Sequence, residues 1–184
     1  MTSRRVKEDK EKLWDKVVDF HGHSCGGLAI GYKAALYAIE LLDLEFSEDE
    51  DVVCISENDA CGVDSIQVLL GCSIGKGNLL FHMTGKQAFT FFNRKTDKSI
   101  RLLLRERPKG MSRESSYNYL MSREPKELFD IKEAKLKLPE EARIFESYVC
   151  KECGEMTGAH WIRVKGEEKY CIDCYPEYDR FNIS

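Results

Sequence analysis

The chain has 184 residues, with 28 basic and 32 acidic side chains and a formal net charge of −4. Its 42% hydrophobic and 33% charged content supports a packed core and excludes wholesale disorder, and its length allows one ordinary domain with a smaller one. No apolar run reaches the roughly 20 residues needed to span a bilayer, because Lys33 interrupts the best candidate. The polar N-terminus is not a secretory signal, so we expect a cytoplasmic protein without membrane contact.

The first half of the chain predicts the order helix, helix, strand, helix. Residues 4–20 carry apolar side chains at helical spacing, and they end at the segment HGHSCGG. A second helix is expected from Leu28 to Leu42, directly after a glycine pair. The β-branched run from Val52 to Ile55 predicts a strand, the segment ENDACG predicts a loop, and residues 63–70 predict a helix.

The middle of the chain predicts a glycine-rich loop followed by a sheet. The loop GCSIGKGN lacks the glycine spacing of a phosphate-binding P-loop and the hydroxyl residue after the lysine, so nucleotide hydrolysis is not expected. Three β-prone runs follow, NLLFHMTG, KQAFTFFNR and SIRLLLRER, and short polar turns between them predict an antiparallel meander. The fold class is therefore α+β, with helices packed on a largely antiparallel sheet in which one parallel pairing is allowed.

Composition divides the chain into three regions. Residues 1–110 form the predicted α+β domain. Residues 111–143 are highly charged and rich in helix formers, with a break at Pro125, and predict a helical connector. Residues 144–184 contain paired cysteines and predict a small zinc-finger domain.

The C-terminal region contains the most specific motif of the chain, two CxxC pairs separated by 17 residues. The cysteines are Cys150, Cys153, Cys171 and Cys174. This spacing is typical of a four-thiolate zinc ribbon or treble clef, in which a hairpin is expected around Lys165 and Gly166. A closed set of four thiolates favours a structural zinc ion over a rubredoxin-like iron or a catalytic metal.

Charge argues against nucleic-acid binding by this module. From Tyr148 to Ser184 there are five basic and seven acidic residues, and an acidic surface is a poor binder of polyanions. Protein contact or structural capping is the expected role. His160, the histidine of this region, is expected to have a hydrogen-bonding or surface role.

The segment HGHSC concentrates His21, His23 and Cys25 within five residues. In an extended loop, residues two apart project to the same side, so the three side chains can converge on one zinc, iron, nickel or copper ion. Cys25 is also expected at the N-terminus of the second helix, where a thiolate is stabilised. This placement permits metal ligation or nucleophilic and redox chemistry. The alternative is that the histidines only buttress the loop through hydrogen bonds.

Cys61 is the best candidate to complete this centre, because it follows the predicted strand and opens the next helix. Asp59 and Asp64 are candidates to ligate the metal, orient a histidine, bind substrate or cap the helix. Cys72 is a weaker candidate, and Cys54 is expected in the core because it lies in an apolar run.

A basic run offers a second kind of ligand contact. From Arg94 to Lys109, seven basic residues oppose only Asp97 and Glu106. Such a run is either a solvated strand face or a positive rim that receives an anionic small molecule or an acidic partner protein.

Taken together, these motifs resemble the FmdE family of formylmethanofuran dehydrogenase components. FHGHSCGGLAIGYK, ENDACGVDSIQVLLGCSIGKGN and GKQAFTFF carry the resemblance, which spans residues 14–107. Some members of that family are also followed by a zinc finger of this kind. Where the family usually has proline after the cysteine of its first motif, this chain has Gly26, which loosens the loop and leaves the ligand side chains in place.

The resemblance implies an α+β domain, often a homodimer, with a metal or reactive-cysteine site. Our leading hypothesis is a cytoplasmic metal-binding protein in one-carbon or molybdopterin-linked redox metabolism, with redox-enzyme subunits as partners. His21, His23, Cys25 and Cys61 would form its centre, with zinc favoured over nickel or iron. The pterin reaction itself is not implied, because the chain has no pterin-binding length and no iron–sulfur cysteine set.

Two alternatives belong to other functional classes. In the first, the protein is a thiol enzyme in which Cys25 is a nucleophile or redox thiol, with Cys61 and His23 in the catalytic set. In the second, it is a non-catalytic adaptor or regulator whose zinc finger holds a partner.

Overall fold

The computed structural model describes residues 10–175, which divide into two compact units after Ala142. Residues 4–9 of the first predicted helix and residues 176–184 of the predicted zinc-finger domain lie outside the described residues. Within the described residues, no helix has the length and apolar character needed to cross a membrane.

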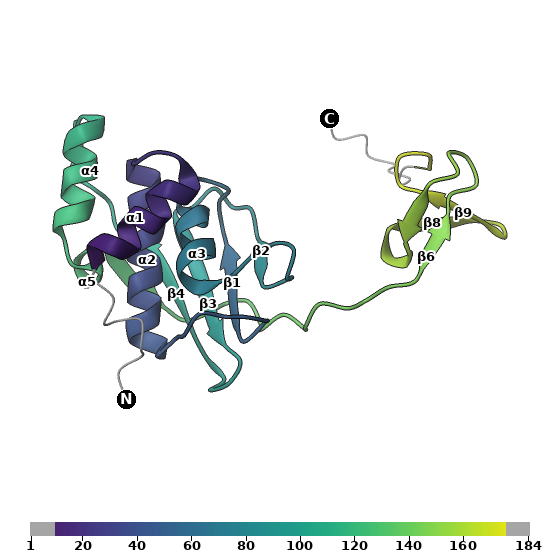
Figure 1. Ribbon diagram of the computed structural model, residues 1–184, viewed down its shortest axis with the longest axis horizontal. Coiled ribbons are helices and arrows are strands. Elements are labelled where there is room, and N and C mark those ends of the chain that lie inside the picture. The colour runs from purple at the N-terminus through teal and green to yellow at the C-terminus, as the bar shows by residue number, and fades with distance from the viewer. Residues whose placement is uncertain (1–9, 176–184) are drawn as a thin grey trace. The chain divides into compact units, whose positions relative to one another are not determined.

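The first unit is a mixed α/β structure with its helices on one face of a five-stranded sheet (Figure 1). Its helices are α1 (Lys10–His21), α2 (Gly26–Leu42), α3 (Gly62–Leu70), α4 (Arg113–Ser122) and α5 (Pro125–Leu128). Its strands are β1 (Val52–Ser56), β2 (Leu79–Phe81), β3 (Ala88–Asn93), β4 (Lys98–Leu104) and β5 (Phe129–Lys132). The α+β class with a largely antiparallel sheet is confirmed.

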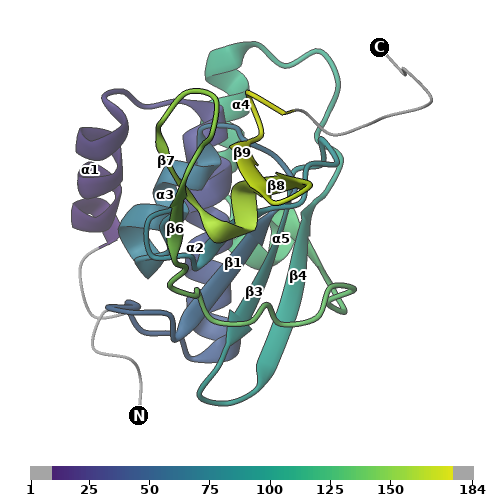
Figure 2. The same ribbon diagram turned by 90° about the vertical axis from the view of Figure 1, so that its right-hand side faces the viewer.

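The strand order is β2-β1-β3-β4-β5, and β1, β3 and β4 lie side by side in Figure 2. Cys54 on β1 pairs antiparallel with Phe91 on β3 and parallel with Leu79 on β2. The predicted meander is therefore wrong for its first strand, which pairs with β1 and not with β3. The physical reason is that α3 connects β1 to β2, and a crossover helix returns the chain in the same direction to form a parallel pair.

Helix α2 is the centre of the core. Residues from several of its faces are buried, which agrees with its run of alanine, leucine and isoleucine. Its backbone lies against α3 so closely that a Cβ added at Gly31 would overlap with the Gly62 carbonyl group. The hydroxyl of Ser65 on α3 donates a hydrogen bond of 2.8 Å to the carbonyl oxygen of Leu28. These contacts fix the two helix N-termini beside each other.

Residues 111–143, expected as a helical connector, contain α4 and α5 and also strand β5. Leu120 and Phe129 are fully buried in the core of the first unit, and Phe129 pairs with Leu104 of β4. The buried ammonium group of Lys33 on α2 donates hydrogen bonds to the carbonyl oxygens of Met121 and Arg123 at the end of α4. This segment is thus packed into the first unit.

The second unit is a small β module. It consists of β6 (Ser147–Val149), β7 (Met156–Gly158), a 3-10 turn (Ala159–Trp161), β8 (Ile162–Lys165) and β9 (Glu168–Cys171). Strands β8 and β9 pair antiparallel around Gly166, which has a positive φ of 64°. The predicted hairpin is confirmed.

Candidate functional site

The three side chains of the HGHSC motif come together where α1 ends and α2 begins. His21 is the last residue of α1, Gly22 has a φ of 90°, and its N–H donates to the carbonyl oxygen of Val18 at 2.7 Å. His21, His23 and Cys25 each offer one potential ligand atom, and these three atoms lie within 4.8 Å of one another. The convergence therefore arises from a helix end, a glycine reversal and a helix start, and not from the extended loop that we predicted.

His21 is held in one orientation by α3. Its Nδ1 lies 2.7 Å from Oδ2 of Asp64, and Gln67 Nε2 donates to Oδ1 of Asp64 at 3.0 Å. A carboxylate only accepts hydrogen bonds, so this contact places a proton on Nδ1 and leaves Nε2 free to accept or to bind a metal. His21 Nε2 lies 4.0 Å from Sγ of Cys25.

Cys25 is the N-cap residue of α2, as predicted. Its Sγ accepts a hydrogen bond of 3.3 Å from the N–H of Leu28. The backbone N–H groups and the dipole at a helix N-terminus stabilise a thiolate. The side chain is half-buried. Cys25 is thus suited to metal ligation and to nucleophilic chemistry.

Cys61 lies beside Cys25 at the N-terminus of α3, although it is not in the close group formed with the two histidines. A Cβ added at Gly27 would lie 3.6 Å from the Cys61 sulfur and 3.9 Å from the Cys25 sulfur. Burial, followed by the hydrogen bond with Cys25, raises the pKa of the Cys61 thiol. Glycine at position 27 therefore lets both sulfurs lie close to the backbone of α2.

The loop that carries Cys61 is anchored to the sheet by a buried ion pair. Arg101 Nη2 on β4 donates to Oε2 of Glu57 at 3.0 Å, and the Thr84 hydroxyl donates to the same oxygen at 2.8 Å. The hydrogen bond from Arg101 is the main reason that the pKa of Glu57 is lowered. Asn58 Nδ2 donates to the carbonyl oxygen of Lys86 at 2.9 Å. The loop is therefore tied to two other segments of the chain.

A surface hollow of about 380 Å³ opens beside this centre, with His21, Cys61 and Asp64 in its lining. Ile74 and Phe81 form part of an apolar wall, and Asp59 adds a second carboxylate. None of the described lining residues is a lysine or an arginine. The lining thus does not favour a phosphate- or carboxylate-bearing ligand.

The basic run from Arg94 to Lys109 is largely ion-paired. Its pairs are Arg94–Glu50, Lys95–Asp51, Arg101–Glu57, Arg105–Asp130 and Lys109–Glu106. These partners include residues from β5, from the loop before β1 and from the loop after β1, which the local sequence could not reveal. These ion pairs favour the interpretation of the run as a strand face over a positive rim that receives an anionic ligand or partner.

The two other cysteines of the first unit lie outside the centre. Cys54 and Cys72 are fully buried, and the Cys72 thiol donates to the carbonyl oxygen of Val52 at 3.5 Å. Burial raises the pKa of Cys72 to about 12. Both behave as core residues, as predicted for Cys54.

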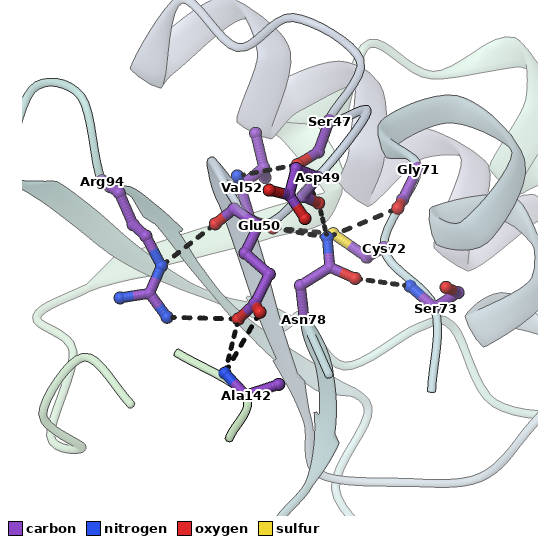
Figure 3. Close-up of polar contacts among 10 residues, drawn as sticks. All are labelled: Ser47, Asp49, Glu50, Val52, Gly71, Cys72, Ser73, Asn78, Arg94 and Ala142. Atoms are coloured by element: carbon purple, nitrogen blue, oxygen red, sulfur yellow. Dashed lines mark hydrogen bonds and ion pairs between the residues drawn. The ribbon is translucent and has the colours of Figure 1, made fainter. Parts of the chain in front are cut away.

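The glycine-rich loop is held by its own polar side chains (Figure 3). Asn78 Nδ2 donates to the carbonyl oxygen of Val52 at 2.9 Å, while its Oδ1 accepts from the N–H of Ser73 at 2.8 Å. The ammonium group of Lys76 donates to the carbonyl oxygen of Ser47 at 2.6 Å. The lysine of this loop is therefore a structural tether, in agreement with the exclusion of a P-loop.

Figure 3 also shows how the end of the first unit is fastened: the carboxylate of Glu50 accepts the backbone N–H of Ala142 at 3.0 Å.

The second unit brings together the four cysteines of the CxxC pairs. The sulfurs of Cys150, Cys153, Cys171 and Cys174 lie within 4.8 Å of one another. Cys150 Sγ accepts from the N–H of Cys171 at 3.3 Å, and hydrogen bonds from the backbone of Cys153 and Cys171 lower the pKa of Cys150 to about 6. The His160 ring packs against the Phe145 ring in a tilted arrangement, at a centroid distance of 4.2 Å, and His160 is outside the cluster. The arrangement fits a closed four-thiolate metal site.

Comparison with known proteins gives a family match over most of the chain. A family model described as "FmdE, Molybdenum formylmethanofuran dehydrogenase operon" matches residues 20–149. A probable S-adenosyl-L-methionine-binding protein of Archaeoglobus fulgidus is 29% identical over 199 residues. That match covers 91% of this chain and 53% of the relative, so the chain spans about half the length of the relative.

The fold is also similar to that of a solved structure. The crystal structure of a tungsten formylmethanofuran dehydrogenase FmdE-like protein from Syntrophus aciditrophicus superposes with a TM-score of 0.66 at 23% identity. The match covers 97% of this chain and 100% of the other. At this identity the similarity establishes the fold alone.

Proposed function

Because the chain belongs to the FmdE family, we propose that it is a metal-binding protein whose functional centre is formed by His21, His23 and Cys25, with Cys61 beside it. The observation that carries the proposal is the 2.7 Å contact between His21 Nδ1 and Asp64, which leaves Nε2 directed at the group of ligand atoms. A histidine that binds a metal is usually oriented in this way, by a carboxylate that accepts a hydrogen bond from its other ring nitrogen.

The donor set fits zinc best. Two imidazoles and one thiolate suit a borderline-soft ion, and nickel and iron accept the same donors. In this centre Asp64 fixes the tautomer of His21, and the N–H of Leu28 stabilises the Cys25 thiolate. A bound zinc ion with an open position would polarise a carbonyl group or activate water. The hollow lined by His21 and Cys61 gives a small molecule access to that side of the centre.

We assign a structural zinc ion to the four cysteines of the second unit. The unit has few residues and exposes large apolar side chains such as Ile144, Trp161 and Val164, so its own core is small. A metal held by four thiolates supplies the missing folding free energy.

The family description supports a place in one-carbon or molybdopterin-linked redox metabolism. On this proposal the protein works in the cytoplasm as a homodimer and associates with components of a redox enzyme. The family link does not by itself assign a reaction to this chain.

The proposal is tested by elemental analysis of the purified full-length protein. We expect two metal ions per chain in the wild type and one in Cys25→Ala, because only the second unit then keeps its ligands. Cys72→Ala is the matched control, since it removes a thiol outside the centre and should retain two ions. A single ion in the wild type that Cys25→Ala leaves unchanged would overturn the proposal.

A second candidate function is thiol catalysis by Cys25. Asp64, His21 and Cys25 are arranged in the order orienting acid, base and nucleophile. Iodoacetamide alkylation of Cys25 as a function of pH separates the two functions. A free nucleophile is alkylated before any chelator is added, whereas a ligated thiol is protected until the metal is removed.

A further inference from the structure

Two thiols from different helices meet at the candidate centre. Cys25 and Cys61 are the N-cap residues of α2 and α3, and both sulfurs lie within 4 Å of the position that a Cβ at Gly27 would take. A metal centre with two histidines and one thiolate does not require a second thiol in contact with the first, so the role of Cys61 needs its own explanation.

The contact is built into the rigid part of the fold. The close approach of Gly31 and Gly62 and the hydrogen bond from Ser65 to Leu28 hold α2 and α3 together. The two thiols are therefore kept as neighbours whether or not an ion is bound.

The pair is also accessible to reagents. Cys25 and Cys61 are both half-buried, and Cys61 lines the surface hollow. Cys54 and Cys72 form a contrasting pair in the same unit, because both are fully buried. Exposure thus distinguishes the two pairs, and thiol reactivity requires exposure.

We propose that Cys25 and Cys61 are a redox-active dithiol that reduces small-molecule disulfides. One thiolate of the pair attacks a sulfur of the disulfide R–S–S–R, and the S–S bond breaks to release the first R–S⁻, which takes up the proton lost from the attacking thiol. The second thiolate attacks the protein sulfur of the mixed disulfide and releases the second R–SH. Two protein thiols are oxidised to one disulfide, and R–S–S–R is reduced to two R–SH.

This reaction controls the metal centre. A sulfur in a disulfide cannot act as a thiolate ligand, so the oxidised pair and a metal held by Cys25 exclude each other. The exclusion rests on the proposed metal-binding function, whereas the dithiol reaction does not.

The test uses the reduced full-length protein and hydroxyethyl disulfide, a small uncharged probe. After quenching with N-ethylmaleimide, peptide mapping without reduction should find the Cys25–Cys61 cross-link in at least about tenfold excess over Cys54–Cys72. In Cys61→Ser the mixed disulfide on Cys25 should accumulate, since the resolving thiol is absent. Cys72→Ala is the control and should form the cross-link as the wild type does. Circular dichroism verifies that each variant is folded.

Absence of the cross-link, or failure to trap the mixed disulfide in folded Cys61→Ser, overturns the dithiol. Metal analysis before and after oxidation separates this result from the proposed function. Loss of one ion on oxidation supports the exclusion. A cross-link in a chain that holds one ion throughout supports the dithiol and overturns the metal centre. Two ions without a cross-link support the metal centre and overturn the dithiol.

Discussion

The orientation of His21 depends on Asp64, a residue 43 positions away in the sequence. The histidine side chain is only 12% exposed, so the hydrogen bond to Asp64 forms in a shielded environment. Gln67 supports the second carboxylate oxygen from the next turn of α3. The carboxylate of Asp64 thus determines which imidazole nitrogen of His21 faces the centre.

Replacing Asp64 with asparagine should weaken metal binding at the centre of His21, His23 and Cys25. Metal binding by the four cysteines of the second unit should stay unchanged. The amide is similar in size, but it lacks the negative charge that favours a proton on Nδ1 of His21, so Nε2 becomes a weaker metal ligand. Loss of such an outer partner lowers metal affinity by about 10- to 100-fold. Competition with a fluorescent zinc chelator measures the change.

The matched control for this substitution is Asp59→Asn, which removes a carboxylate from the same hollow at an exposed position. It should change the zinc affinity by less than about threefold, because surface charges interact weakly. Equal losses in both variants would show that general negative charge, and not orientation of His21, supports the site.

The sequence marked the candidate ligands and, in Asp64, a candidate to orient a histidine, but it did not mark the ion pair that anchors the loop of Cys61. His21, His23 and Cys25 are close together in the chain, so a short motif reveals them. Glu57 and Arg101 are 44 residues apart, and neither position has a local pattern that marks it as a buried ion pair. Contacts of this kind depend on strand register, which charge counting does not supply.

At the scale of elements, the crossing of α2 and α3 determines the centre. It places Cys61 beside Cys25, while the packing of α1 against α3 places Asp64 against His21. The close approach requires glycine at positions 31 and 62, where a Cβ would meet the backbone of the other helix.

Substitution of Gly31 by alanine should therefore disrupt both stability and the centre. Because the added methyl group meets backbone, the helices must separate, and such overpacking costs about 1–3 kcal/mol or more. Urea unfolding in a Trp161→Phe background, in which Trp14 alone reports on the first unit, measures the loss. Metal analysis should also show weaker metal binding at the centre of His21, His23 and Cys25.

Gly26→Ala is the control on the same helix. Its added Cβ would lie 3.7 Å from Leu120 Cδ1, an ordinary van der Waals contact, so stability should change by no more than about 1 kcal/mol. If both variants unfold at the same urea concentration as the wild type, the helix crossing is not the constraint that we describe.

Helices and the β8–β9 hairpin were predictable because hydrophobic spacing and turn residues specify them locally. The partner of β2 was not, since a run such as NLLF is compatible with either edge of a neighbouring strand. Residues 129–132 likewise became a strand because β4 offered a free edge, although the region is rich in helix formers.

At the scale of the whole molecule, the two compact units have different sources of stability. The first unit has a continuous core that includes Leu28, Phe89 and Phe129, all fully buried. In the second unit, the described hydrophobic side chains that are buried include Cys150 and Cys171, which belong to the cysteine cluster. The first unit is therefore stabilised by packing, and on our proposal the second depends on a metal ion held by its four cysteines.

Removal of zinc should accordingly unfold the second unit and leave the first folded. With a high-affinity zinc chelator, hydrogen exchange should show loss of protection in peptides covering β8 and β9, while α2 and β3 keep theirs. Cys150→Ser should give the same result without chelator, because three thiolates no longer close the site. Cooperative loss of protection in both units would contradict the independence of the two units, and a protected β8–β9 hairpin in the zinc-free protein would contradict the dependence of the second unit on zinc. The expected result instead ties folding of the second unit to its ion, so zinc depletion would unfold this unit and leave folded the helices that hold Cys25 and Cys61.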